Sequence, residues 1–124
     1  MQNVMSRTPV IGVLVEDLLF RTKIETTARQ LGIALANAPW TDAALIILDL
    51  HNKGIDPIAW LEEFKQDLQT KRIPVLAFFS HVQSDFKKKA VDAGCNLVVP
   101  RSVLLAQLPQ LLIRYVKTRL PIAP

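Results

Sequence analysis

The sequence is poor in the residues that build several kinds of functional site. It has one cysteine, Cys95, so neither an internal disulfide nor a cluster of thiolate metal ligands can form within the chain. Its four glycines, Gly12, Gly32, Gly54 and Gly94, stand apart from one another, so no loop has the glycine-rich pattern that cradles phosphates. We expect Cys95 to be a buried thiol rather than a nucleophile.

Long apolar runs are also missing. None approaches the roughly 20 residues that a helix needs to cross a bilayer, and the polar start 1–8 lacks the apolar core of a signal peptide. We therefore expect a soluble, cytoplasmic protein without a membrane partner. The length of 124 residues fits a single domain, with its core at about 9–120. The net charge of +4 is mild and no nucleic-acid-binding motif accompanies it, so we do not expect nucleic acid as the partner.

Apolar runs alternate with helical patterns along the whole chain. Runs at 9–15, 33–36, 43–50, 73–79 and 97–99 are typical of strands buried in a parallel sheet. After the first run, one helical face carries Phe20, Ile24, Ala28 and Leu31. This alternation predicts an α/β fold with a five-stranded parallel sheet and helices on both faces.

One connection is too short for this pattern. Only residues 37–42 separate the second and third strands, whereas a crossover between parallel strands usually needs a dozen or more. The second helix is therefore predicted to be reduced or missing. We expect Trp40 to cover the part of the core that this helix would otherwise bury.

The later helices carry their own signals. Asp56 is predicted to cap a helix with Pro57 at its first position, where a proline costs no hydrogen bond. The buried stripe of this helix is predicted to be Leu61, Phe64 and Leu68. The next helix is predicted to end at Gly94. Near the carboxyl end, Ser102 is predicted to cap a turn through Leu105, and Pro109 to open or kink the last helix.

Polar side chains follow the predicted strands at their carboxyl ends. Glu16 and Asp17 follow the first strand, Asp49 closes the third, Ser80 follows the fourth, and Arg101 follows the fifth. In open α/β sheets, functional sites lie at this edge. Carboxylates in this arrangement suit Mg²⁺, and an aspartate can act as a nucleophile that forms an acyl phosphate.

At these positions the sequence resembles the receiver domains of bacterial two-component response regulators. The matching segments are Val15–Asp17, Leu45–Asp49, Ile73–Val75 and Ala90–Gly94, in the family's order and spacing. The resemblance implies a flavodoxin-like (CheY-like) sheet of strand order 2-1-3-4-5. It also implies that Glu16, Asp17 and Asp49 bind Mg²⁺ and that Asp49 accepts phosphate from a histidine kinase.

Two departures from the family concern the residues that would contact a phosphoryl group. The family's Thr or Ser near the end of strand four aligns with Phe79, and Ser80 comes one residue later. The family's Lys-Pro after strand five is replaced by Pro100-Arg101. Ser80 and Arg101 are therefore the candidate phosphate contacts, and the departures are typical of an atypical or pseudo-receiver.

The leading hypothesis is a signalling protein, not an enzyme, that acts through protein contacts because only a short tail follows the last helix. Two versions stay open: phosphorylation of Asp49 with Mg²⁺, or a phosphorylation-independent interaction module. The resemblance places a partner or homodimer face on the helix near 84–94, the strand 97–99 and the last helix, where Lys87–Lys89, Arg101, Arg114, Lys117 and Arg119 could make the surface basic. Alternatives of another class are a small enzyme or a nucleotide- or nucleic-acid-binding protein. His51 and His81 are read as surface residues rather than ligands.

Overall fold

The computed structural model of the chain describes residues 8–80 and 84–117. Its strands are β1 (Val10–Leu14), β2 (Ala34–Leu35), β3 (Leu45–Asp49), β4 (Val75–Phe79) and β5 (Leu97–Pro100). Its helices are α1 (Leu18–Gln30), α2 (Pro57–Gln66), α3 (Ser84–Asp92) and α4 (Arg101–Leu112), and α4 continues into a π-helical turn, η2 (Ile113–Lys117). Among the described helices, none is long and apolar enough to span a membrane.

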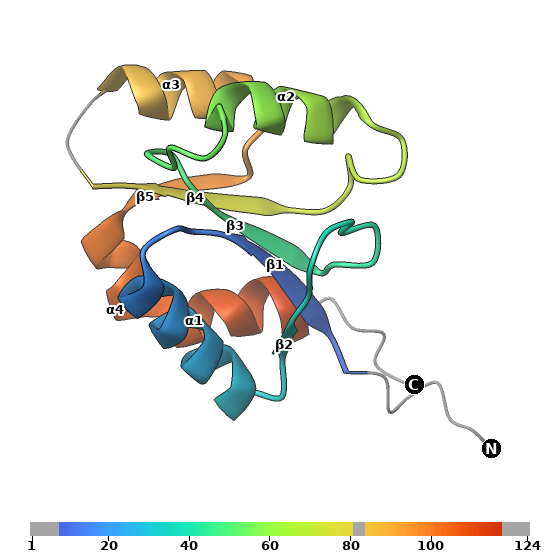
Figure 1. The fold of residues 1–124 in the computed structure, drawn as a ribbon, viewed down its shortest axis with the longest axis vertical. Coiled ribbons are helices and arrows are strands. Elements are labelled where there is room, and N and C mark those ends of the chain that lie inside the picture. The colour runs from blue at the N-terminus through green and yellow to red at the C-terminus, as the bar shows by residue number, and fades with distance from the viewer. Residues whose placement is uncertain (1–7, 81–83, 118–124) are drawn as a thin grey trace.

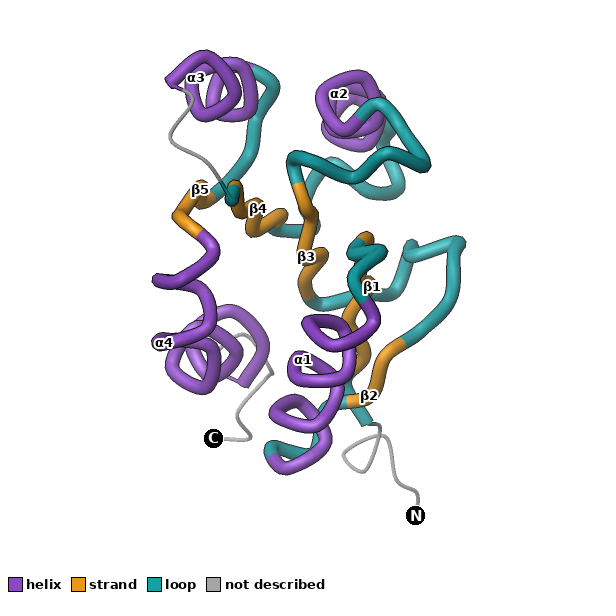
Figure 2. The backbone as a smooth tube through the Cα atoms, turned by 60° about the vertical axis from the view of Figure 1, so that its left-hand side comes forward, coloured by secondary structure: helices purple, strands orange, loops and turns teal. Residues whose placement is uncertain are grey.

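The strands form one parallel sheet of order β2-β1-β3-β4-β5, which confirms the predicted flavodoxin-like topology. Helices α2 and α3 cover one face, and α1 and α4 cover the other (Figures 1 and 2). Along β3, Leu45 and Ile47 face the α1/α4 side while Ile46 and Leu48 face the α2/α3 side, and all four are fully buried. The continuous apolar run thus reflects a strand that is covered on both faces.

Trp40 covers β1 where the second crossover helix is absent. Residues 36–44, all described, form no helix, as predicted. The indole lies directly over Gly12, because a Cβ atom at residue 12 would stand only 2.7 Å from Cε2 of Trp40. Its Nε1 donates a hydrogen bond of 2.8 Å to the carbonyl oxygen of Ala36. One aromatic side chain therefore covers a part of β1 that a crossover helix would otherwise bury.

The predicted start of α2 and the stop of α3 are confirmed. The carboxylate of Asp56 accepts a hydrogen bond of 3.2 Å from the backbone N–H of Ala59, and Pro57 occupies the first turn. Gly94 follows α3 with a φ of +102°, a conformation that residues with a Cβ atom rarely adopt. The sequence was sufficient to predict these two helix ends, because the capping interactions involve only residues that are close in the sequence.

The predicted burial of Leu68 is wrong. Helix α2 ends at Gln66, and Leu68 lies in the following turn with 81% of its surface exposed. The carboxylate of Asp67 accepts a hydrogen bond of 2.8 Å from the backbone N–H of Gln69, an arrangement that favours a turn over another helical residue. Thr70 takes the inner position instead, and its hydroxyl donates to the carbonyl oxygen of Phe64.

Of the two predicted roles of Pro109, the opening of the last helix is wrong. Helix α4 begins at Arg101, directly after β5, and Pro109 lies inside it, so Ser102 belongs to the helix rather than to a separate turn. A proline inside a helix costs roughly 3 kcal/mol. Burying a leucine contributes about 1.5–3 kcal/mol, and α4 buries four: Leu104, Leu108, Leu111 and Leu112. The packing outweighs the lost hydrogen bond, and the helix continues past Pro109.

Candidate functional site at the carboxyl edge of the sheet

The three predicted acids lie at one edge of the sheet, where β1 and β3 end. These strands are paired, with Leu14 opposite Leu48, so the residues that follow them emerge side by side. Asp49 is the last residue of β3 and is half-buried, whereas Glu16 and Asp17 are exposed in the connection to α1. Each acid has a different partner within the protein.

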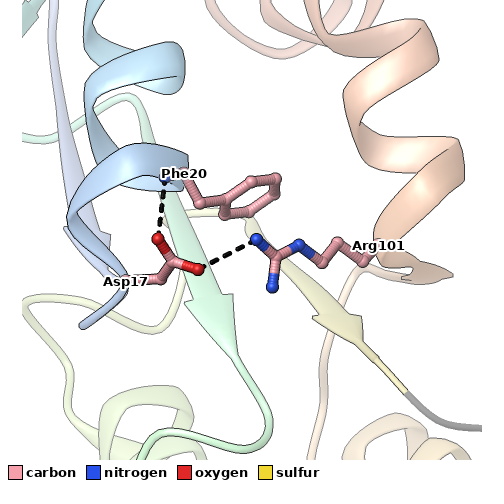
Figure 3. A network of polar contacts seen from close by, with 3 residues as sticks. All are labelled: Asp17, Phe20 and Arg101. Carbon is pink, nitrogen blue, oxygen red and sulfur yellow. Dashed lines mark hydrogen bonds and ion pairs between the residues drawn. The ribbon is translucent and has the colours of Figure 1, made fainter.

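Asp17 joins two elements that are far apart in the sequence. Its Oδ1 accepts a hydrogen bond of 3.1 Å from the backbone N–H of Phe20 and so caps α1. Its Oδ2 lies 3.0 Å from Nη2 of Arg101, the first residue of α4 (Figure 3). The Phe20 N–H and then the Arg101 guanidinium hold the pKa of Asp17 below its ordinary value. Both oxygens of this carboxylate are therefore engaged by the protein.

Phe20 forms a platform for Arg101. The guanidinium carbon lies 4.4 Å from the centre of the Phe20 ring, within the range of a cation–π interaction. The ring is itself buried, and its centre stands 4.7 Å from that of Phe78 in β4. Arg101 is thus held from two sides, by a carboxylate and by an aromatic face that is anchored in the core (Figure 3).

Asp49 accepts a hydrogen bond of 2.8 Å at Oδ1 from the backbone N–H of His51. Burial raises the pKa of Asp49, and the nearby negative charge of Glu16 acts in the same direction, while the His51 N–H and the positive charge of Arg101 oppose it. The His51 ring packs edge-on against Phe86 of α3, with centroids 5.1 Å apart. His51 therefore contacts the site through its backbone.

The loop after β3 contains a structural residue that the sequence reading missed. Asn52 is buried, its Nδ2 donates to the carbonyl oxygen of Leu14 at 3.2 Å, and its Oδ1 accepts from the N–H of Gly54 at 2.8 Å. In the same loop, the N–H of Lys53 donates to Oε1 of Glu16 at 2.8 Å. These contacts tie the end of β1 to the loop. A single polar residue in a polar loop gives no signal of such a role.

Ser80 and Phe79 differ sharply in environment. Phe79 is buried among the residues under α2 and α3, and it pairs with Pro100 of β5 in regular register. Ser80 follows the strand and is exposed. His81 lies outside the described residues. The aromatic side chain at the aligned hydroxyl position therefore points into the core rather than to the acids.

The described part of the chain has no large cluster of metal ligands. Among the described residues, no group of three or more His, Cys, Asp or Glu side chains is arranged to hold a metal ion. Mg²⁺ commonly takes one or two carboxylates together with waters and phosphate oxygens, and the guanidinium of Arg101 already engages an oxygen of Asp17 that such an ion would use. Arg101, rather than a second acid, is the group within bonding distance of Asp17.

Cys95 is a half-buried thiol remote from this edge. Its Sγ lies 3.2 Å from the carbonyl oxygen of Val75 and 3.3 Å from that of Leu97. Burial raises the pKa of this thiol, which keeps it protonated and unreactive. Cys95 was expected to be a buried thiol and is half-buried, and its lack of a nucleophilic role stays a prediction.

Asp49→Asn is expected to stabilise the protein by roughly 0.5 kcal/mol at pH 7, a small effect because solvent screens a half-exposed charge. The folded protein holds a proton on Asp49 at pH values above the ordinary 3.8 of an aspartate. Stability from this group is therefore highest at acid pH and falls as the pH rises through the raised pKa. Urea unfolding at pH 3.5 and 7 tests this: the gain should be present at pH 7 and absent at pH 3.5. A gain of equal size at both pH values contradicts the assignment.

Comparison with solved structures identifies the fold. No protein-family model matches the sequence, and no curated protein matches it significantly. The phosphorylated cyanobacterial phytochrome response regulator RcpA has a TM-score of 0.76 and 18% identity, over 90% of this chain and 96% of its own. The Mn²⁺-bound response regulator Rcp1 has a TM-score of 0.71 and 16% identity, over 94% and 99%. The receiver domain of the sensor histidine kinase PA1611 from Pseudomonas aeruginosa, with Mg²⁺ in its active-site cleft, has a TM-score of 0.74 and 17% identity, over 90% and 99%. The chain therefore has the flavodoxin-like fold of response-regulator receiver domains.

Proposed function

We propose that the protein is a receiver-like signalling module that acts through protein–protein contacts and does not depend on phosphorylation of Asp49. The fold supports the signalling part of this proposal, because the similar structures include a phosphorylated response regulator and a receiver domain of a sensor kinase. Independence from phosphorylation is the second of the two versions that the sequence leaves open. The residues at the carboxyl edge favour it.

The observation that carries the proposal is the environment of Phe79. A phosphoryl group can shift a protein between two states only through contacts that differ between those states. The hydroxyl that the resemblance assigns to this contact is replaced by a buried aromatic ring. Neighbouring Ser80 is exposed and lies beyond the regularly paired part of β4. A phosphoryl group on Asp49 would therefore lack the hydroxyl contact that could favour one conformation of the protein over another.

The surface next to the acids suits a protein partner. Leu18 and Leu19 open α1 with 75% and 85% of their surfaces exposed, and they follow Glu16 and Asp17 directly. Exposed apolar side chains that are flanked by charges are common in protein interfaces. Their position at the start of α1 makes this edge a contact surface that needs no chemistry at Asp49.

Two described cations of the predicted basic face on α3, β5 and α4 are paired with acids, and Arg119 of that face lies outside the described residues. Arg101 turns to Asp17, and Lys88 forms an exposed ion pair of 3.1 Å with Asp92. Arg114 lies over the ring of Tyr115, 5.3 Å from its centre. Contact of this face with a second copy, a histidine kinase or another signalling protein remains part of the proposal. The two ion pairs lower the net positive charge of the described part of this face, which makes nucleic acid a poorer partner.

A small-molecule enzyme receives little support. A hollow of about 540 Å³ lies between α2 and α3, and it is lined by residues such as Asp56, Phe86 and Lys89. None of Glu16, Asp17 and Asp49 lines it. The acids and the hollow therefore do not form one site of the kind that would bind and convert a substrate.

Incubation with Mg²⁺ and acetyl phosphate tests the proposal. Intact-mass spectrometry is expected to find no phosphoryl adduct on the wild-type protein, and none on Asp49→Asn. A receiver domain that is readily labelled by acetyl phosphate serves as the positive control. A wild-type adduct that Asp49→Asn abolishes would overturn the proposal in favour of the phosphorylated version.

A further inference from the structure

The contact between Arg101 and Asp17 joins the start of α4 to the start of α1. The two residues are 84 positions apart, and Nη2 of Arg101 lies 3.0 Å from Oδ2 of Asp17. Both side chains keep about two fifths of their surface exposed, so the pair stands at the mouth of the acidic edge rather than in the core. Figure 3 shows the guanidinium group extending from α4 towards the carboxylate.

The geometry of this contact is fixed from two directions. Oδ1 of Asp17 is held by the backbone N–H of Phe20 at 3.1 Å, which orients the carboxylate so that Oδ2 meets the guanidinium. The Phe20 ring supports the guanidinium from the side at 4.4 Å. Because Phe20 contributes both the N–H and the ring, one residue positions both partners. A pair preorganised in this way loses less side-chain entropy than a free surface pair.

One carboxylate oxygen of each of the two remaining acids accepts a hydrogen bond from a backbone N–H group. Oε1 of Glu16 accepts from Lys53 and Oδ1 of Asp49 accepts from His51, each at 2.8 Å. A divalent ion at this edge would be repelled by the guanidinium beside Asp17. The guanidinium also engages the Asp17 oxygen that such an ion would use.

We infer that Arg101 takes the place of a divalent cation in this chain: its guanidinium is a built-in counter-ion, and the acidic edge binds a metal ion at least about tenfold more tightly when that charge is removed. This inference rests on the acids and Arg101 alone and is independent of the proposed signalling function. It also assigns Arg101 a role other than that of a phosphate contact.

Titration with Mn²⁺, followed by the loss of the electron paramagnetic resonance signal of the free ion, tests the inference. Arg101→Gln is expected to bind Mn²⁺ at least about tenfold more tightly than the wild type, since it loses a positive charge in contact with a ligand oxygen. Lys88→Gln is the matched control, because it removes the same charge from another exposed pair of similar length. It should bind no more tightly than the wild type. The double variant Arg101→Gln/Asp17→Asn should lose the gain.

Arg101→Met retains the apolar part of the side chain over Phe20 and provides a second test, with the same expected gain in Mn²⁺ affinity. Circular dichroism establishes that each variant is folded. The inference is overturned if the wild type binds Mn²⁺ as tightly as Arg101→Gln, or if the gain persists without Asp17. Tight Mn²⁺ binding by the wild type would leave the proposed function standing, because that proposal fails only on a phosphoryl adduct at Asp49.

Discussion

Replacing Phe20 by alanine is expected to lower the free energy of unfolding by about 3–5 kcal/mol, the usual cost of removing a buried aromatic side chain. Only 3% of the surface of Phe20 is exposed. The ring packs on Phe78 at 4.7 Å, tilted by 58°, in the core between the sheet and α1. Chemical denaturation followed by circular dichroism measures the loss. A change below about 1 kcal/mol would contradict this account of the packing.

The same residue allows the platform under Arg101 to be measured separately from core packing. Phe20→Leu keeps most of the buried volume but removes the aromatic face, so it should cost much less than Phe20→Ala. Combined with Arg101→Gln in a double-mutant cycle, it should give a coupling energy of about 0.5–1 kcal/mol, as for a partly exposed cation–π pair. If the stability losses of Phe20→Leu and Arg101→Gln are additive, the contact between the guanidinium and the ring does not stabilise the protein.

The expected loss of stability on Phe20→Ala is several times larger than the expected coupling energy between Phe20 and Arg101. Most of the contribution of Phe20 is to the core, and a smaller part serves the site. The Asp17–Arg101 pair therefore depends on a residue that the fold requires anyway. This dependence explains how an exposed ion pair can have a fixed geometry.

The sequence was sufficient for the sheet because its signals are strong and local. The run that ends at Asp49 is apolar throughout, and the structure buries it on both faces. The cap at Asp56 and the stop at Gly94 act within one helical turn. The strand order came from the resemblance to receivers and not from periodicity alone, since alternation predicts parallel pairing but not which strands are neighbours.

The errors arose where packing or a competing local bond decided the outcome. Leu68 continues the helical spacing of Phe64, but the hydrogen bond to the Asp67 carboxylate turns the chain first. Pro109 reads as a helix boundary, but the buried leucines of α4 outweigh the bond that it removes. The spacing of apolar residues in the sequence does not predict either outcome, because each depends on what the faces of the helix contact in the folded protein.

For the candidate site, the sequence predicted the edge but not the partners. Parallel strands place their carboxyl ends together, so Glu16, Asp17 and Asp49 were expected near one another. The pairing of Asp17 with Arg101 links residues 84 positions apart and depends on the aim of one long side chain. The replacement of Lys-Pro by Pro100-Arg101 indicated that this side chain was displaced from the family pattern. It did not indicate that the arginine would turn to an acid.

Replacing Trp40 by alanine is expected to cost about 2–3 kcal/mol, less than for a fully buried tryptophan because the indole is half-exposed. The loss should be this large because residues 36–44 supply no helix to cover β1 in its place. The indole rests on Gly12, donates to Ala36 and meets the Trp60 ring edge-on at 6.2 Å. Denaturation followed by far-ultraviolet circular dichroism is the suitable measurement, because the variant loses one of only two tryptophans.

A double-mutant cycle with Gly12→Ala tests whether Trp40 replaces the helix through that contact. In the wild type, a Cβ atom at residue 12 would stand 2.6 Å from Cδ1 of Ile46 and 2.7 Å from the indole, so Gly12→Ala alone should cost about 1–3 kcal/mol. Without the indole, the added methyl group fills part of the vacated space, and the double variant should be more stable than the sum of the single losses predicts. Leu108→Ala, which removes a buried side chain on the opposite face of the sheet from Trp40, should add to Gly12→Ala within about 0.5 kcal/mol. If Trp40→Ala is equally additive, the indole covers β1 without packing against Gly12. In that case contact with Ile46, whose side chain is the nearest to residue 12, would explain why this position is occupied by a glycine.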